Sequence, residues 1–297
     1  MADPSTGSGQ RDVLFEQRDD GVAVITLNRP DSLNAMGGDL MLLLAKYLGQ
    51  CARDADIRAV VLTGAGRAFC AGGDVKGMAG RSTSNGETST ATRATQSEGG
   101  SVARPGSIIS ALDDGVAGLR ESQMQTSYVL HTMPKPTIGM INGYAVGAGL
   151  SLALACDLRI ASDKAKFGTA FRNVGLSGDY GGSYYMTNLV GTARARELYF
   201  TARIVEADEA LQLGIVNRVV PHDGLAKETL AFAAELAAGP TRTYARMKEN
   251  LNLATHVDLK TLIDHEALNM RLSGMSNDSR EAVRAFVEKR DPKFVGS

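Results

Sequence analysis

The segment INGYAVGAGLSLALACDLRIAS, Ile141–Ser162, contains the unit from which we predict the fold. It begins at the end of a short apolar run, Thr137–Gly143, which indicates a buried strand. The glycine-spaced GYAVGAG follows, and then come an apolar helix at Leu150–Cys156 and a further strand, DLRIAS. Strands that alternate with helices in this way predict a layered α/β core.

Similar units occur nearer the start of the chain. VLFEQR and VAVITLN (Val13–Arg18 and Val22–Asn28) are rich in β-forming residues, and the intervening DDG is a hairpin signal. RAVVLTG, Arg58–Gly64, is a short buried strand closed by glycine. Between these strands, one helix face is formed by Leu40, Leu43, Leu44, Tyr47 and Leu48.

The composition changes abruptly after this first part. Between Gly80 and Ser107 the only bulky apolar residue is Val102, and serine, threonine and glycine dominate. Such a segment buries too little surface to offset its ordering entropy, so we predict a mobile insert at about 80–107. The chain then divides into a disordered start (1–10), a core that contains the insert (11–210) and a helical C-terminal region (211–297). Helical spacing resumes at Ile108–His131 and ends before the prolines of MPKP.

The overall composition excludes several classes of protein. The net charge of −1 argues against binding to nucleic acid or to an anionic membrane. No apolar run reaches the roughly 18 residues of a spanning helix, and the first residues lack the apolar core of a signal peptide. The 3 cysteines and 4 histidines have no metal-ligand spacing, so we expect no metal site and a reducing, cytoplasmic location.

Two small-residue segments are candidates for a binding site: AFCAGGDVKGM (Ala68–Met78) and the glycines that precede Leu150. Small residues let a ligand approach the backbone, and the free N–H groups at a helix start stabilise negative charge. One N–H group from each segment would form an oxyanion hole. Glycine content alone favours the structural alternative, in which these glycines serve tight turns and close packing, because neither segment is a dinucleotide or phosphate-loop fingerprint.

Five motifs in order make the interpretation specific. The chain resembles the crotonase (enoyl-CoA hydratase/isomerase) superfamily from about Val13 to Phe294, apart from the serine-rich insert. This resemblance implies a crotonase (ClpP-like) spiral of strand–strand–helix units with a helical C-terminal region that forms homotrimers or homohexamers. It also implies an acyl-CoA substrate whose enolate oxygen is held by the N–H groups of Gly73 and Ala148. The motifs are LNRPDSLNAM, AFCAGGDV, INGYAVGAGLSLALACDLRIAS, KFG and AFVEKRDPKF.

The chain departs from the family pattern at the two glutamates that hydratases use. The matching positions hold Ser151 and Phe171. A hydroxyl without a neighbouring base cannot act as a general base at neutral pH, and a phenyl ring transfers no proton. Water addition by two glutamates is therefore not expected, and Ser151 is expected to bond back to the preceding helical turn or to pack in the core.

Asp179 is the remaining acid, in FGTAFRNVGLSGDYGG (Phe167–Gly182). GLSGDYGG is similar to the segment in which single-acid isomerases of the superfamily carry their acid, and in which a related aryl-CoA dehalogenase carries its nucleophile. Aspartate is also a favoured N-cap, so a helix-capping role stays open and does not exclude catalysis. Aromatic neighbours such as Phe171 and Tyr180 would desolvate Asp179 and raise its pKa.

The resemblance also implies a substrate-binding set. Phe286 and Lys289 would reach the site of a neighbouring subunit, whereas Glu121 is a weaker candidate that we expect on a solvated face. For a single surface lysine, solubility is the stronger alternative. The substrate- and CoA-binding residues are predicted to be Arg29, Ala71, Gly73, Asp74, Val75, Lys76, Gly147, Phe171, Phe286 and Lys289.

The predicted function is enoyl-CoA double-bond isomerisation, in which Asp179 moves the proton and no resident cofactor takes part. The alternatives are hydration, hydrolysis or a dehalogenase-type reaction that uses the same aspartate. A third possibility is a non-catalytic acyl-CoA-binding protein that has lost its acids.

Overall fold

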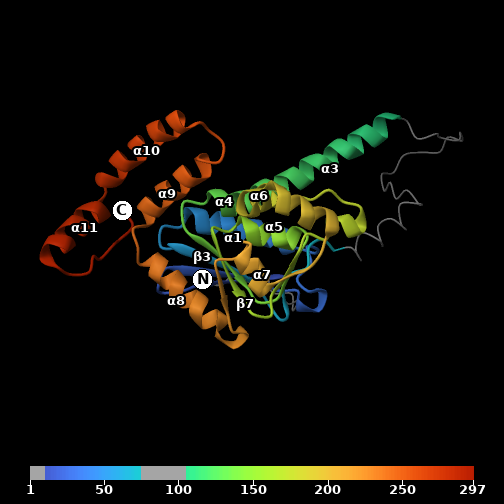
Figure 1. Cartoon of the computed structure of the whole chain (residues 1–297), viewed down its shortest axis with the longest axis horizontal. Coiled ribbons are helices and arrows are strands. Elements are labelled where there is room, and N and C mark those ends of the chain that lie inside the picture. The colour runs from blue at the N-terminus through green and yellow to red at the C-terminus, as the bar shows by residue number, and fades with distance from the viewer. Residues whose placement is uncertain (1–10, 75–104) are drawn as a thin grey trace, which may run out of the picture.

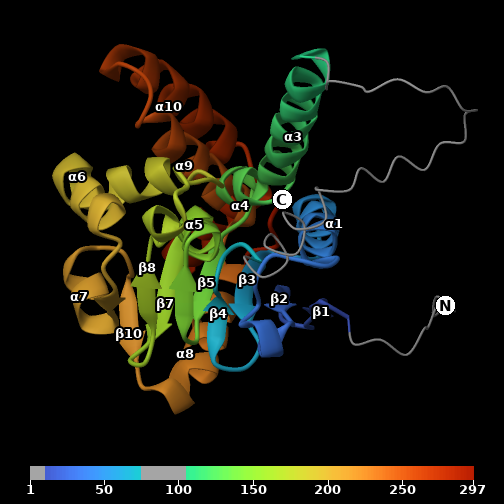
Figure 2. The same ribbon diagram turned by 90° about the vertical axis from the view of Figure 1, so that its right-hand side faces the viewer.

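The computed structural model describes residues 11–74 and 105–297, with side chains from residue 113 onward in the second range. Two sheets form its centre (Figure 2). The larger sheet has the order β1-β2-β3-β5-β7-β10, and the smaller has the order β4-β6-β8-β9. The strands are β1 (Val13–Gln17), β2 (Val22–Leu27), β3 (Ala59–Gly64), β4 (Ala68–Cys70), β5 (Thr137–Ile141), β6 (Tyr144–Val146), β7 (Leu158–Ser162), β8 (Lys166–Gly168), β9 (Val205–Glu206) and β10 (Arg218–Val220).

The chain builds both sheets at once by repeating a strand–strand–helix unit. In each repeat the first strand joins the larger sheet and the second joins the smaller one. Thus β3 and β4 are followed by β5 and β6, and then by β7 and β8, with each strand parallel to its predecessor in the same sheet. The predicted α/β spiral of such units is confirmed. The helices that separate the pairs are α3 (Pro105–Gln125), α4 (Ser127–Thr132) and α5 (Ala148–Ala155), and α6 (Gly182–Thr201) follows the last pair.

Alternating side chains of the larger sheet enter two apolar clusters. Ala23 and Ile25 of β2 belong to the main core with α1 (Leu40–Arg53), whereas Val22 belongs to a second cluster with α8 (Leu225–Ala237). Successive residues of a strand point to opposite faces, so these two helices cover opposite faces of the sheet. The sheet is therefore buried between helices, as expected for parallel strands.

Three C-terminal helices extend from the sheets at the end opposite to α3 (Figure 1). They are amphipathic, and several of their apolar side chains are exposed; Phe286 has 85% of its surface accessible. Of two further short elements, α7 (Ala207–Gln212) connects β9 to β10, and the turn at His222–Gly224 connects β10 to α8. The three helices are α9 (Thr241–Leu253), α10 (Leu259–Gly274) and α11 (Asn277–Glu288).

The structure differs from the sequence prediction in several places. The helix expected at Ile108–His131 is two helices, broken at Thr126, and it starts at Pro105 because proline suits the first turn of a helix. The last residues of the predicted insert, 105–107, are therefore helical. Residues 1–10 and 80–104 lie outside the described residues. In addition, IVNRVV, which was expected to form a short strand, contains β10, which joins the larger sheet from beyond residue 210. The short strands of the smaller sheet, and α9 and α10 as separate helices, were not predicted.

Candidate active site

The smaller sheet brings the predicted site segments together. Its strands β4, β6 and β8 run parallel, with Cys70 paired to Ala145 and Val146 paired to Gly168. The carboxyl ends of parallel strands meet at one edge, where α/β proteins commonly bind ligands. The segments that follow these strands, Ala71–Asp74, Gly147–Ala148 and Phe171–Gly182, consequently lie beside one another.

Two glycines permit this close approach. Gly72 has φ of 87°, and a Cβ there would lie 2.8 Å from the carbonyl oxygen of Val146 and 3.3 Å from the nitrogen of Ala148. Gly147 has φ of 56°. Larger residues rarely adopt these backbone angles. The structural role suggested for the glycines thus holds at these two positions, and it also sets the AGGD segment against the start of α5.

The N–H groups of Gly73 and Ala148 are the predicted oxyanion donors. Ala148 is the first residue of α5 and is buried, so its N–H lacks an intrahelical acceptor. Gly73 is bridged to Met36, where the Met36 N–H donates to the Gly72 carbonyl at 2.7 Å. Within residues 11–74 and 105–297, no acceptor is found for either N–H.

Asp179 lies in a tight turn before α6. The Gly182 N–H donates to the Asp179 backbone carbonyl at 3.0 Å, and Gly181, with φ of 75°, is the residue that caps the helix. No side chain caps this helix, so Asp179 has no side-chain capping bond. Its Oδ1 is buried without a hydrogen-bond partner among the described residues. Burial raises the pKa of Asp179 to about 6. This is the direction that we predicted from its aromatic neighbours.

Aromatic side chains surround this carboxylate. The Tyr180 hydroxyl lies 3.0 Å from Ser122 Oγ on α3, which ties the turn to that helix. The rings of Phe171 and Tyr199 are nearly parallel, with centroids 6.2 Å apart. Burial, and secondarily the charge of Asp179, raise the pKa of Tyr199 to about 12. Tyr199 was not predicted from the sequence, because it lies at the far end of α6 and outside every motif.

Ser151 and Phe171 take positions that carry no proton chemistry. Ser151 is buried, and its Oγ donates over 3.4 Å to the Gly147 carbonyl, which confirms the predicted back-bond to the preceding turn. A Cβ on Gly182 would lie 2.2 Å from this Oγ. The start of α6 therefore occupies the space next to Ser151 that a longer acidic side chain would need.

The predicted binding residues divide into three groups. Arg29 and Asp74 form an ion pair of 3.6 Å, Arg29 also donates to the Ala35 carbonyl, and the Ala71 N–H donates to Leu33. Phe286 and Lys289 lie at the end of α11, far from the site of their own chain (Figure 1). Glu121 is exposed, as expected. Val75 and Lys76 lie outside the described residues.

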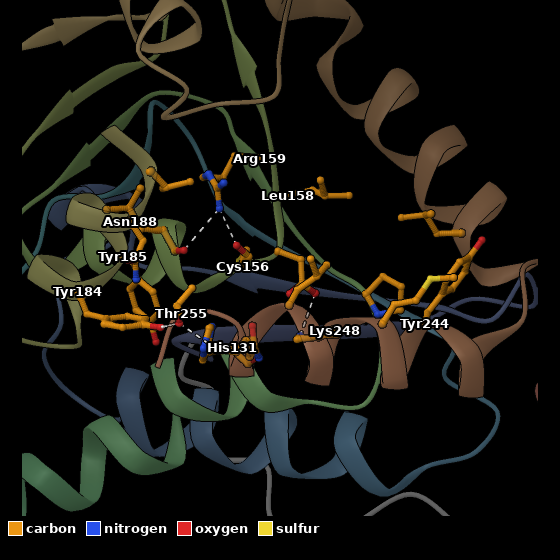
Figure 3. Close-up of a pocket in the computed structure, with 18 residues that line it drawn as sticks. His131, Cys156, Leu158, Arg159, Tyr184, Tyr185, Asn188, Tyr244, Lys248 and Thr255 are labelled. Atoms are coloured by element: carbon orange, nitrogen blue, oxygen red, sulfur yellow. Dashed lines mark hydrogen bonds and ion pairs between the residues drawn. The ribbon is translucent and has the colours of Figure 1, made fainter. Parts of the chain in front are cut away.

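A separate apolar pocket of about 420 Å³ lies between the core and α9, and it contains none of the predicted site residues (Figure 3). Tyr184, Thr255 and His131 lie along one part of it. Its charged groups are bonded within the protein. Lys248 Nζ donates to Asp157 Oδ2 at 2.9 Å and to two backbone carbonyls, and the Arg159 guanidinium donates to the carbonyls of Leu154, Cys156 and Ile215.

Two kinds of feature are absent from the parts of the chain that the structure describes. Among residues 11–74 and 105–297, no cluster of histidine, cysteine, aspartate and glutamate has the arrangement of a metal site. None of the helices in those ranges is long and apolar enough to cross a membrane.

Comparison with known proteins decides the family. The profile of the family described as Enoyl-CoA hydratase/isomerase matches residues 17–117 and 107–297. The chain belongs to this family. The crotonase fold expected from the sequence is therefore confirmed.

Similar proteins within the family carry more than one activity in their names. The 1,2-epoxyphenylacetyl-CoA isomerase of Escherichia coli (strain K12) is 37% identical over 93% of this chain and 95% of its own length. The short-chain-enoyl-CoA hydratase of Clostridium acetobutylicum is 30% identical over 92% of this chain and 94% of its own length. A crystal structure of enoyl-CoA hydratase from Bacillus anthracis superposes with a TM-score of 0.80, at 29% identity, over 97% of this chain and 100% of that one.

Proposed function

We propose that this enoyl-CoA hydratase/isomerase family enzyme moves a double bond in an enoyl-CoA thioester, with Asp179 as the only proton shuttle. The observation that carries the proposal is the half-buried Asp179 carboxylate. Its Oδ1 has no hydrogen-bond partner among residues 11–74 and 105–297, and burial raises its pKa to about 6. A general base works best with a pKa near the operating pH. Ser151 and Phe171 leave no second acid at the hydratase positions.

The proposed reaction needs only one carboxylate. Asp179 takes a proton from C2 of a 3-enoyl thioester, and the electron pair moves into the thioester carbonyl to form a dienolate. The protonated Asp179 exchanges its proton with solvent and returns a proton to C4, which leaves the double bond between C2 and C3. The reaction needs no oxidant, metal or resident cofactor, since the coenzyme A thioester is itself the substrate.

The N–H groups of Gly73 and Ala148 are proposed to hold the dienolate oxygen. Both belong to segments at the same sheet edge, and both lack an acceptor among the described residues. Donors that are preorganised toward a developing oxyanion lower the barrier, because they do not reorganise during the reaction. The helix dipole of α5 adds to this effect at Ala148.

The remaining binding residues are proposed from the family match. Arg29 and Lys76 are proposed to contact the nucleotide. The other predicted contacts to the substrate are Ala71, Asp74, Val75, Gly147 and Phe171, and a structural role is the stronger alternative for Asp74, which pairs with Arg29. Phe286 and Lys289 are proposed to contact the nucleotide bound to a neighbouring subunit, in a homotrimer or homohexamer. The exposed stripe of Val283, Phe286 and Val287 on α11 supports such contacts. A mass of one chain by light scattering at micromolar concentration would argue against an oligomer.

Hydration is the second candidate, because hydratases are among the similar proteins. In that reaction, or in hydrolysis, Asp179 would activate a water. Hydration normally uses one group to orient water and another to protonate carbon, and the second group is missing at Ser151 and Phe171. We therefore favour isomerisation.

The test is hydrogen exchange at C2 of a panel of 3-enoyl-CoA and 2-enoyl-CoA esters in deuterium oxide. Isomerisation predicts deuterium at C2 and C4 with interconversion of the two esters. Formation of 3-hydroxyacyl-CoA would favour hydration. Binding of the esters without any exchange at C2 would indicate a non-catalytic binding protein and contradict the proposal.

A further inference from the structure

Tyr199 supports the turn that carries Asp179. It lies on the last part of α6, and its ring lies against both glycines that flank the turn. A Cβ on Gly178 would be 3.2 Å from Tyr199 Cε1, and a Cβ on Gly182 would be 2.8 Å from the Tyr199 hydroxyl oxygen. The absence of a side chain at both positions lets this ring lie close to the turn, so Tyr199 is one of the side chains that pack against it.

The same side chain connects the turn to the other parts of the candidate site. A Cβ on Gly182 would also lie 2.2 Å from Ser151 Oγ of α5, so Ser151 and the Tyr199 hydroxyl both lie next to this glycine. On its other side, the Tyr199 ring stacks on Phe171, whose Cε1 would lie 3.9 Å from a Cβ on Gly147. Tyr199 thus packs between the segment that supplies Asp179 and the segment that supplies the Ala148 N–H.

The hydroxyl of Tyr199 donates no hydrogen bond to any residue in the described part of the chain. Tyr199 therefore holds the turn in place mainly through the packing of its ring. Because burial raises the pKa of Tyr199 to about 12, the phenol is neutral at physiological pH. The ring therefore places no charge near Asp179.

We propose that Tyr199 is a positioning residue, whose ring fixes the Asp179 turn relative to the start of α5 and keeps water away from the carboxylate. This inference rests on the proposed function, in which Asp179 moves the proton. An error of about 1 Å in the position of a reacting group can lower a rate about a hundredfold, so the packing of this ring matters for turnover.

Few other groups bear on the titration of Asp179. From its own turn, Tyr180 faces it and is held by Ser122 of α3, and the buried thiol of Cys70 on β4 acts on Tyr180. Tyr199 faces it from α6. Burial is the cause of the raised pKa of Asp179, with no charged side chain contributing among the described residues.

The experiment compares Tyr199→Leu, Tyr199→Phe and a matched control, Phe200→Leu, in the full-length enzyme. Phe200 is the next residue on α6, but it is largely exposed. The Asp179 carboxyl is titrated by carbon-13 NMR without substrate, and kcat and KM are measured with a 3-enoyl-CoA ester. Thermal unfolding shows which variants are folded.

We expect Tyr199→Leu to lower the Asp179 pKa from about 6 toward its ordinary value of 3.8, because water enters the space left by the ring. It should also lower kcat at least about tenfold with KM changed less than about threefold, since the turn moves but the CoA contacts stay. Tyr199→Phe keeps the ring and should restore both readouts to near the parent values. Phe200→Leu should change neither.

Two results would overturn the inference. The first is a folded Tyr199→Leu enzyme with an unchanged Asp179 pKa and an unchanged kcat. The second is a Tyr199→Phe enzyme as impaired as Tyr199→Leu, which would assign the effect to the hydroxyl. The substrate-free titration separates this inference from the proposed function. If Asp179→Asn retains full exchange while Tyr199→Leu still shifts the Asp179 pKa, the ring positions the carboxylate but the carboxylate is not the base.

Discussion

The turn that carries Asp179 and the pocket under α9 both place charged groups among aromatic rings, but they differ in hydrogen bonding. In the pocket, Lys248 has three acceptors and its partner Asp157 also accepts from Thr137. In the turn, Oδ1 of Asp179 is buried without a partner among the described residues. Native proteins pair nearly all their buried polar groups, so an unpaired carboxylate marks a site where another molecule is expected to supply the partner.

The surroundings of the two carboxylates, Asp179 and Asp157, differ in the same way. The pKa of Asp179 rises to about 6 through burial alone, whereas the Asp157 carboxylate has a cation and two donors from Thr137 beside it. A raised carboxyl pKa in a cleft is characteristic of catalytic acids and bases. The pocket in Figure 3 is apolar and well formed, yet its polar groups hold the structure together and leave little free for chemistry.

Apart from Asp179 itself, we expect the largest effect on turnover at the oxyanion donors. Ala148→Pro removes one N–H at the first position of α5, where a helix tolerates proline. Loss of one such donor costs roughly 2.7–4 kcal/mol of barrier, so kcat should fall about 10²–10³-fold in a folded enzyme. Ala148→Gly is the control, because it keeps the N–H. Equal turnover by the folded proline variant and the parent would remove Ala148 from the oxyanion hole.

The pocket predicts an effect on stability instead of turnover. Lys248→Met removes the cation from a nearly buried ion pair and leaves Asp157 with only the donors of Thr137. We expect a loss of about 3 kcal/mol in the free energy of unfolding, measured by urea denaturation with an unchanged m-value. The double variant with Asp157→Asn should lose less than the sum of the single changes. If Lys248→Met abolishes turnover while stability is unchanged, the pocket belongs to the active site.

The smallest effect is expected at Ser151. Its Oγ makes one long bond to Gly147 and has no base beside it, so Ser151→Ala should stay within about tenfold of the parent in kcat/KM, or roughly 1.4 kcal/mol. Asn142→Ala is the control, because the Asn142 side chain also donates to a backbone carbonyl, that of Gly66, but lies outside the candidate site. A loss of a hundredfold or more at Ser151 would mean that its hydroxyl takes part in proton transfer.

The sequence predicted those features that depend on local pattern. The strands of the larger sheet, α1 and the amphipathic α8 and α11 follow from periodicity, and Phe171 and Tyr180 indicated the desolvated surroundings of Asp179. The short strands of the smaller sheet were missed, because three residues such as Ala68–Cys70 carry too little periodicity to be recognised. They become strands only because neighbouring chain segments supply their hydrogen bonds.

The contacts around Asp179 could not be predicted for a related reason. Tyr199 contacts the turn only because α6 packs back over the site. Hydrophobic periodicity and short motifs do not predict such a contact between residues that are distant in sequence. The glycines at 178 and 182 were the one signal, since both leave room for a large neighbour. The sequence could not identify which residue fills that room.

The most direct test of the account is hydrogen exchange at C2 of a 3-enoyl-CoA ester by Asp179→Asn. Asparagine keeps the size of the side chain, and a neutral group should not destabilise the fold. A carboxyl whose pKa is raised in the folded state binds its proton more tightly there, so the parent loses stability as pH rises from about 4 through 6, whereas the variant should not. The account predicts a variant at least as stable as the parent at pH 8, with exchange lowered at least 10²–10⁴-fold. A variant that keeps full exchange, or that unfolds well before the parent at that pH, would show that Asp179 is a structural residue and would contradict the account.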